Sequence, residues 1–323
     1  MFSPDLTTSF RNQIDTAKII WICVHVDPDG DCLWAWLGLW MYLEQYWKSV
    51  RYFVPSKISC IFSFLPEISQ FQEHIWTYNP DIRISVDTAT RARSNLSQII
   101  TDKPIIHIDH HPTNAPRWTL NLIDDSSNST CEIITYLIHQ HQPENMTPRI
   151  ATFLLMWIST DTGHFQRWSN LAETFERTSF LLNKWADLSL IVNQLYRSND
   201  YNGTKFVWKL MQRIVHDDRL IRVSLSQTEL IEHNLDDAKT EQLLFIMTWI
   251  KHDGVFMLFK WFPEAENPYL KCSFRTKHPT LDVSILAKQF WWGWHRAAAA
   301  CRVFSDNLEK TQQEMIDWVK SRI

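Results

Sequence analysis

Residues 18–31 read Lys18-Ile19-Ile20-Trp21-Ile22-Cys23-Val24-His25-Val26-Asp27-Pro28-Asp29-Gly30-Asp31. The continuous apolar run at 19–24 is typical of a buried strand in a parallel sheet. The seven residues after it combine a histidine and three aspartates with the proline and glycine of a turn. Ligands of open α/β sheets bind where the strands end. The stretch therefore predicts an α/β fold with a polar site at the end of its first strand.

Three further blocks of acidic and histidine residues follow apolar runs. Asp87 comes after 82–86, and the triplet Asp109-His110-His111 comes after 104–108, both of which we interpret as strands. Asp161, in Ser159-Thr160-Asp161-Thr162-Gly163, follows the helical run 150–158 instead. Residues 51–54 predict another strand, and helical patterns occupy about 33–46, 130–141, 147–159, 171–184 and 187–197. This alternation predicts a doubly wound parallel sheet.

The pattern changes in the second half of the chain. Strands are expected at 219–225, 255–262 and 269–274, and helices at about 238–250, 283–290 and 306–321. We therefore predict a catalytic domain at 1–186, a helical connector at 187–205 and a smaller α/β domain at 206–323.

The bulk composition is that of a soluble globular protein. The 323 residues are 45% hydrophobic and 21% charged, and the net charge of -4 gives no reason to expect a broad nucleic-acid-binding surface. A short nucleotide could still be held by local cations. Six cysteines without a CxxC pair indicate reduced thiols, and no apolar run approaches the roughly 18–20 residues of a membrane span. We expect a cytoplasmic protein.

Carboxylates and imidazoles that gather at one edge of a sheet can hold two divalent metals. Oxygen-rich ligand sets with a few imidazoles suit Mn²⁺ or Mg²⁺ better than thiol-seeking ions. Each block alone has an ordinary explanation: the first could be a simple turn, and Asp161 could cap a helix. The four blocks together favour a metal site. The candidate ligands are His25, Asp29, Asp31, Asp87, His110 and Asp161.

With these blocks in this order, the chain resembles the DHH phosphoesterase family, whose name spells the triplet 109–111. The C-terminal half resembles the associated DHHA1 domain through 273–276, 282–284 and 287–290. His295 then stands where that domain has the histidine of its glycine-rich loop. The length and layout are most similar to the stand-alone nano-RNase and pAp-phosphatase subgroup.

The resemblance implies a role for each residue. One metal would be held by His25, Asp29 and Asp87, and the other by Asp31, Asp87, His110 and Asp161, with Asp87 bridging. The two catalytic residues would be Asp109, which supports the site, and His111, which faces the phosphate. Mn²⁺ is the expected activator, with Mg²⁺ or Co²⁺ as alternatives. The second domain would bind substrate through Arg275, Gly293 and His295.

The implied activity is hydrolysis of short oligoribonucleotides, of 3′-phosphoadenosine 5′-phosphate (pAp), or of both. Two metals would lower the pKa of a bound water, which attacks phosphorus in line. The alternatives are a phosphodiesterase for cyclic-di-AMP or linear dinucleotides, and a catalytically impaired nucleotide-binding protein. A family II pyrophosphatase fits less well because the second domain carries the His295 loop pattern, and a processive exonuclease would be expected to have additional nucleic-acid-binding domains. A homodimer is suggested by the resemblance alone.

Glycine and tryptophan have abnormal abundances. The chain has 6 glycines and 17 tryptophans, whereas usual glycine content of about 7% would give more than 20. Trp34, Trp291, Trp292 and Trp294 occupy glycine positions of the family, Trp36 occupies a small-residue position, and Trp185 is a further case of the same kind. Three hypotheses explain this: UGA glycine codons translated as tryptophan, genuine divergence, or deliberate alteration. The first predicts glycine at 34, 291, 292 and 294 in the native protein.

Overall fold

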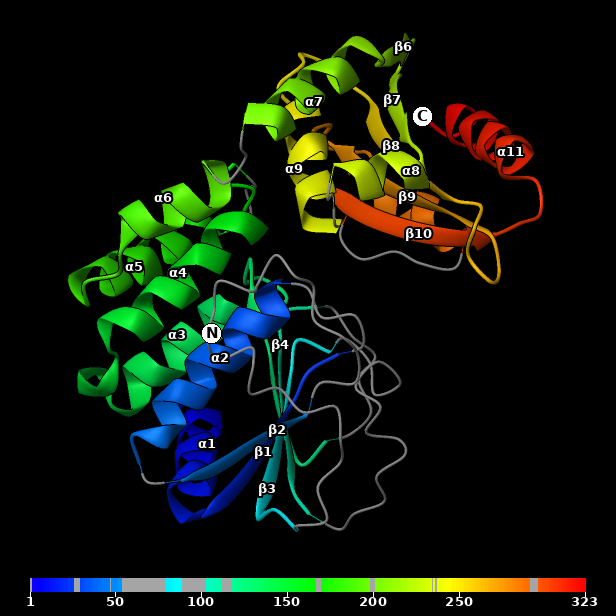
Figure 1. Ribbon diagram of the computed structural model, residues 1–323. Coiled ribbons are helices and arrows are strands. Elements are labelled where there is room, and N and C mark those ends of the chain that lie inside the picture. The colour runs from blue at the N-terminus through cyan, green and yellow to red at the C-terminus, as the bar shows by residue number, and fades with distance from the viewer. Residues whose placement is uncertain are drawn as a thin grey trace. The chain divides into compact units, whose positions relative to one another are not determined.

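The chain folds into two compact units. A computed structural model describes residues 2–25, 30–46, 48–53, 79–88, 103–111, 118–166, 170–197, 201–233, 235, 237–290 and 296–323. The described residues up to 197 belong to the first unit, and those from 201 onward belong to the second (Figure 1). The stretch 187–205, for which we expected one connector, holds α6 (Leu188–Tyr196) in the first unit and the start of α7 (Tyr201–Gln212) in the second.

A five-stranded parallel sheet forms the centre of the first unit, which confirms the predicted fold class. Its strands are β1 (Ile19–Cys23), β2 (Ser49–Phe53), β3 (Ile82–Val86), β4 (Ile105–Asp109) and β5 (Leu120–Ile123), in the order β2-β1-β3-β4-β5. In β1, Ile20 is paired with Val50 on one side and with Ile82 on the other. From β1 the strands are added toward β2 on one side and toward β3 on the other, so the strand order reverses between β1 and β3. Doubly wound sheets of this order bind ligands at that point.

The described helices of this unit lie on one side of the sheet (Figure 1). Three of them contact strands: α1 (Pro4–Thr16), α2 (Gly30–Glu44) and α3 (Thr130–His141). The short 3₁₀ helix η4 (Pro143–Asn145) links α3 to α4 (Pro148–Asp161), which packs on α2 and α3. Helix α5 (Leu171–Asn183) and α6 pack in turn on α4. The sequence predicted these helices except α1 and η4.

Helix α2 is apolar on all sides because it is buried on all sides. Its glycines allow α4 to approach closely. A methyl group at Gly30 would lie 1.7 Å from the ring of Trp157, and one at Gly38 would lie 2.8 Å from a methyl of Leu154. The close packing fixes the two helices that carry Asp31 and Asp161.

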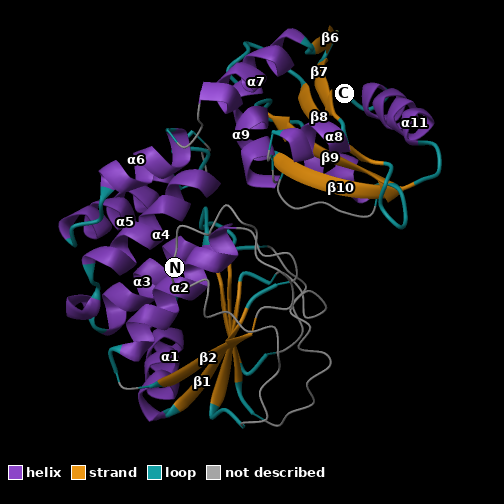
Figure 2. Ribbon diagram, viewed as in Figure 1, coloured by secondary structure: helices purple, strands orange, loops and turns teal. Residues whose placement is uncertain are grey.

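The second unit is a mixed sheet with helices on both faces (Figure 2). Its strands are β6 (Val215–Asp217), β7 (Leu220–Leu225), β8 (Val255–Phe262), β9 (Tyr269–Thr276) and β10 (Ala298–Phe304), in the order β10-β9-β8-β7-β6. Only the pair β7–β8 is parallel. One core contains α10 (Val283–Lys288) and α11 (Leu308–Lys320), and the other contains α7, α8 (Gln227–Glu232) and α9 (Asp237–Met247).

Strand β8 shows why this sheet needs both helical layers. Val255, Met257 and Phe259 pack into the core with α10 and α11. Phe256 and Leu258 alternate with them and pack into the core with α7 to α9. Successive side chains of a strand point to opposite faces, so the unbroken apolar run requires cover on both sides.

Candidate metal centre

Three neighbouring strands deliver polar side chains to the same edge of the first sheet. His25 follows β1, Asp87 follows β3, and Asp109 ends β4. All three are almost fully buried. Asp87 has a left-handed backbone with φ of 53°, which aspartate tolerates better than most residues. As predicted for these blocks, the polar residues meet at the carboxyl ends of the strands.

Two helices add carboxylates to this edge. Asp31 lies in the first turn of α2, and Asp161 is the last residue of α4 rather than the cap of a later helix. The start of α3 holds Asp31, because the backbone N–H groups of Thr130 and Cys131 donate to its two oxygens at 2.6 and 3.1 Å. Burial raises the pKa of Asp31 well above its usual value, and the negative charges of Asp161 and Asp87 raise it further. Such crowding favours a bound cation.

His110 lies among three carboxylates. Its Nδ1 faces the carbonyl oxygen of Ser127 at 3.4 Å. Its Nε2 is 3.7 Å from Asp31, 3.7 Å from Asp87 and 3.9 Å from Asp161. These distances are too long for hydrogen bonds. They suit ligands that each lie about 2.0–2.2 Å from a shared ion.

The described residues include three overlapping groups that could hold a metal ion. In each group the ligand atoms lie within 4.8 Å of one another. The groups are His25, Cys32 and Asp87; Asp87, His110 and His111; and Asp31, His110 and Asp161. The first and third groups share no residue, so each can hold an ion of its own. The second group shares Asp87 with the first and His110 with the third, so the two positions are neighbours. The donor set therefore fits two neighbouring divalent cations.

Asp109 acts on its two histidine neighbours. Its Oδ1 accepts from the backbone N–H of His111 at 2.9 Å and lies 2.7 Å from Nδ1 of that ring, while Oδ2 is 3.3 Å from Nε2 of His107. Burial opposes ionisation of Asp109, yet the hydrogen bonds from both imidazoles lower its pKa well below the usual value. Burial likewise opposes protonation of His111, yet hydrogen bonds to Asp109 and Asp87 raise its pKa well above the usual value. The contacts of Asp109 orient the His111 ring and favour its protonated form.

Sequence reasoning missed Thr130 and Cys32. The Thr130 hydroxyl donates to Oδ1 of Asp87 at 2.9 Å. The start of α3 had a detectable signal, since Ser129 and Glu132 have capping-box spacing and the Ser129 hydroxyl accepts from the Glu132 N–H at 3.2 Å. Nothing in the sequence indicated that this helix start would contact Asp31, 99 residues away.

Several predicted site residues are not placed at this centre. Asp29, Gly293 and His295, with Trp291, Trp292 and Trp294, lie outside the described residues. Arg275 lies on β9 of the second unit, where its Nη1 donates to the Phe274 carbonyl at 2.7 Å. Its proposed contact with substrate therefore stays a prediction.

Two of the tryptophans singled out in the sequence have contrasting environments. Trp34 is buried in α2 with its ring centroid 4.7 Å from that of Phe153. Trp185 is 81% exposed and has φ of 65°. Its N–H donates to Leu182 at 2.9 Å, and the next N–H, of Ala186, donates to Leu181 at 3.2 Å. These two bonds are those of a Schellman motif, in which this position strongly favours glycine.

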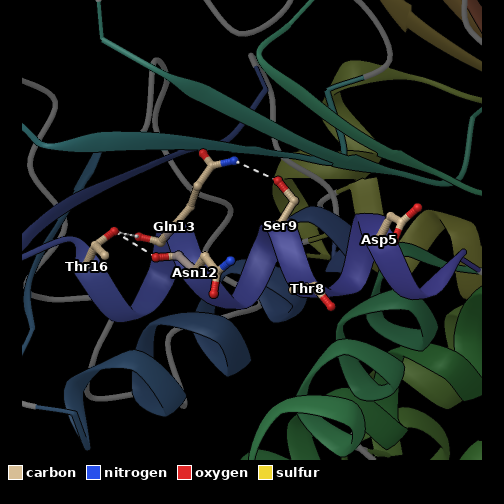
Figure 3. Close-up of a pocket in the computed structure, with 6 residues that line it drawn as sticks. All are labelled: Asp5, Thr8, Ser9, Asn12, Gln13 and Thr16. Carbon is tan, nitrogen blue, oxygen red and sulfur yellow. Dashed lines mark hydrogen bonds between the residues drawn. The ribbon is translucent and has the colours of Figure 1, made fainter.

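A pocket elsewhere in the first unit has no comparable chemistry. Figure 3 shows that it is lined by residues of one helix, α1, whose Gln13 side chain donates to Ser9 at 3.4 Å and whose Thr16 hydroxyl donates to the Asn12 carbonyl at 2.7 Å. The lining includes one carboxylate, Asp5, and neither histidine nor cysteine. We therefore assign no function to it.

Membrane insertion would need a long apolar helix. Among the helices that the structure describes, none combines the length and the apolar character needed to cross a bilayer.

Comparison with known proteins agrees with the site. Residues 19–158 match the family described as "DHH family, N-terminal domain". A relative from Streptococcus mutans, named probable bifunctional oligoribonuclease and PAP phosphatase NrnA, is 26% identical over 92% of this chain and 94% of its own length. The NrnA of Bacillus subtilis is 23% identical over 87% of this chain and 88% of its own length.

Solved structures show the same fold. An exopolyphosphatase-related protein from Bacteroides fragilis has a TM-score of 0.86 at 21% identity, and the match covers 99% of this chain and 98% of that one. RecJ from Thermus thermophilus, solved with Mn²⁺, has a TM-score of 0.54 at 14% identity and covers 99% of this chain and 54% of its own. The strand order, the clustered acidic and histidine residues and the family match together show that residues 19–158 form a DHH-family N-terminal domain, and they indicate a hydrolase that acts on phosphate ester bonds.

Proposed function

We propose that the chain is a two-metal phosphoesterase that hydrolyses short oligoribonucleotides, pAp, or both. The observation that supports this most strongly is that each of the three groups that could hold a metal ion contains Asp87, His110 or both. These two residues follow β3 and β4, near the point where the strand order reverses. The names of the relatives supply the substrate class, since those proteins are called oligoribonucleases and PAP phosphatases.

In this proposal the ligands divide between two positions. His25, Asp29 and Asp87 would hold one ion, and Asp31, Asp87, His110 and Asp161 would hold the other. Asp29 lies outside the described residues. When bound, two divalent cations supply an activated water nucleophile and neutralise charge on the phosphate. Mn²⁺ is the proposed ion, with Mg²⁺ or Co²⁺ as alternatives.

The protein's own contribution to charge stabilisation is assigned to His111. The Asp109 carboxylate lies 2.7 Å from Nδ1 of His111, and the imidazolium would donate its Nε2–H to a phosphate oxygen. His111 is 7% exposed, so its charge acts in a site largely shielded from water, where electrostatic interactions are strong.

The second unit is proposed to bind the rest of the substrate. Arg275 would contact a phosphate or a base, because its planar guanidinium suits both. Gly293 and His295, which lie outside the described residues, are proposed as further substrate-binding residues. We propose residues 1–186 as the catalytic domain and residues 206–323 as the substrate-binding domain.

The test is Mn²⁺-dependent release of mononucleotide from 5′-pApA and of phosphate from pAp. Asp161→Ala should lower both rates by more than about 100-fold, because loss of partners beyond the ligand shell alone costs about 10–100-fold. Asp125→Ala is the control, since Asp125 is an exposed aspartate in the loop after β5. An unchanged rate in the Asp161 variant would refute the assigned ligand set.

A second version of the chain, with glycine at 34, 291, 292 and 294, should be assayed beside the first. Activity confined to the glycine version supports a hydrolase whose tryptophans come from reassigned codons. Metal binding without turnover in both versions would favour the nucleotide-binding alternative or another substrate, such as a cyclic dinucleotide.

A further inference from the structure

Cys32 lies beside the ligands of the first metal position. It follows Asp31 in the first turn of α2 and is fully buried. Its Sγ belongs to the group formed with His25 and Asp87, whose ligand atoms lie within 4.8 Å of one another. The three residues come from the end of β1, the start of α2 and the end of β3, so three rigid elements position them.

The geometry of this group is that of a coordination site. Nε2 of His25 is 3.9 Å from Oδ2 of Asp87, and the Cys32 thiol is 3.5 Å from the carbonyl oxygen of Val86, the residue before Asp87. Nitrogen, oxygen and sulfur ligands lie about 2.0–2.3 Å from a bound ion such as Zn²⁺. One ion can therefore be reached by all three with small rotations of the side chains.

We propose that Cys32 supplies a thiolate to the ion held by His25 and Asp87. The Sγ–H bond breaks, an Sγ–metal bond forms, and the proton leaves to solvent. This inference rests on the proposed two-metal site and deepens it by making the two positions unequal. The position with Cys32 prefers borderline-soft ions such as Zn²⁺, Co²⁺ or Cd²⁺, whereas Asp31, His110 and Asp161 form an all-oxygen-and-nitrogen position.

Cys131 provides a matched control. It is also buried and lies next to the same helix turn, with its Sγ 3.7 Å from the backbone oxygen of Asp31. It belongs to none of the three metal-type groups among the described residues. A thiol effect that is specific to ligation should therefore depend on Cys32 and not on Cys131.

The experiment is a titration of the purified full chain with Co²⁺ and with Cd²⁺, followed by near-ultraviolet absorption. A thiolate-to-metal charge-transfer band is expected at one thiolate per chain, with release of one more proton than in Cys32→Ala. Cys32→Ala and Cys32→Ser should lose the band and bind Cd²⁺ at least about tenfold more weakly, with Mn²⁺ affinity changed by less than about threefold. Cys131→Ala should keep the band.

A band that persists in Cys32→Ala, or no band in the unaltered chain, would overturn the proposal. Far-ultraviolet circular dichroism checks that each variant is folded, and the serine variant keeps the test valid if alanine disturbs α2. None of these readouts requires turnover. A chain that shows the band but hydrolyses neither 5′-pApA nor pAp would refute the proposed substrate and leave the thiolate ligand standing.

Discussion

At the scale of single residues, Asp109 shows how one buried carboxylate determines the state of its neighbours. It contacts His107 and His111 with separate oxygens and is fully buried. It belongs to none of the metal-type groups formed by the described residues. We therefore propose that Asp109 orients the His111 ring and favours its protonated form, which replacement of one carboxylate oxygen by an amide group can test.

Asp109→Asn is expected to lower hydrolysis by about 10–100-fold while the stoichiometry of bound metal stays the same. The Asp109 hydrogen bond raises the pKa of His111, so the imidazolium persists to higher pH in the unaltered chain. Loss of that charge lowers the pKa, and the alkaline limb of the kcat/KM profile should move to lower pH. An alkaline limb that stays in place would show that the cation at His111 does not contribute.

Trp185 tests the glycine hypothesis through stability. Its left-handed φ of 65° costs an L-residue about 1–2 kcal/mol, and its ring is exposed, so little packing offsets the cost. Trp185→Gly should raise the free energy of unfolding by about 1 kcal/mol in urea. Trp208→Gly, at an exposed site inside α7, should lower it by a similar amount because glycine is unfavourable within a helix. Destabilisation by both changes would contradict the hypothesis.

The sequence predicted which residues meet at the centre but not what supports them. His25, Asp87 and the 109–111 triplet were recognisable because each follows an apolar run whose end the sheet aligns. Thr130 and Cys32 were not recognisable, because a threonine at a helix start and a cysteine beside an aspartate are ordinary locally. Both matter only through contacts with residues far away in the sequence. Thr130, for example, donates to Asp87, which lies 43 residues earlier, and no local pattern encodes such a contact.

At the scale of elements, the start of α3 supports the carboxylates of the candidate metal centre. Its first N–H groups hold Asp31 and its first side chain holds Asp87. A helix start favours negative charge, so α3 keeps two mutually repelling carboxylates in place.

Thr130→Val should therefore weaken Mn²⁺ binding by about 10–100-fold, because the variant keeps the shape but loses the hydrogen bond to Asp87. Isothermal titration with Mn²⁺ measures this directly. Thr135→Val is the matched control, since that buried hydroxyl on the same helix donates only within α3, to the Cys131 carbonyl at 2.8 Å. Equal losses in both variants would point to a general effect on α3.

Two elements that the sequence patterns missed, β10 and α1, have different physical causes. Strand β10 contains the run Ala298-Ala299-Ala300, which has helical propensity, yet it pairs with β9 over seven residues. Its pairing partner overrides the local preference. Helix α1 buries only Thr7, Phe10 and Ile14, so its apolar pattern was too sparse to detect. Long periodic elements such as α3 and β8 were predicted nearly to their ends.

At the scale of the whole molecule, the two units have separate cores. Both cores of the second unit contain only residues from 206 onward, whereas the described groups that could hold metal lie in the first. Metal should therefore stabilise the units unequally.

Mn²⁺ at a hundredfold excess over Kd should stabilise the first unit by about 2.7 kcal/mol, which raises its Tm by about 5–10 °C. Differential scanning calorimetry with Mn²⁺ and with a chelator should show one transition that moves and one that stays. In Asp161→Ala the movement should shrink. A uniform shift of all unfolding would contradict independent cores.

The strand order of the first sheet also governs how the chain acquires its structure over time. Strand β1 pairs with β2 about 30 residues later and with β3 about 62 residues later, and closing such loops is slow. The hairpin of β8 and β9, by contrast, closes between Phe262 and Tyr269. During synthesis, β1 is therefore made about 62 residues before the second of its two neighbouring strands. The apolar run at 19–24 lacks one of its partner strands until then, so we expect it to be a segment that a chaperone protects during synthesis.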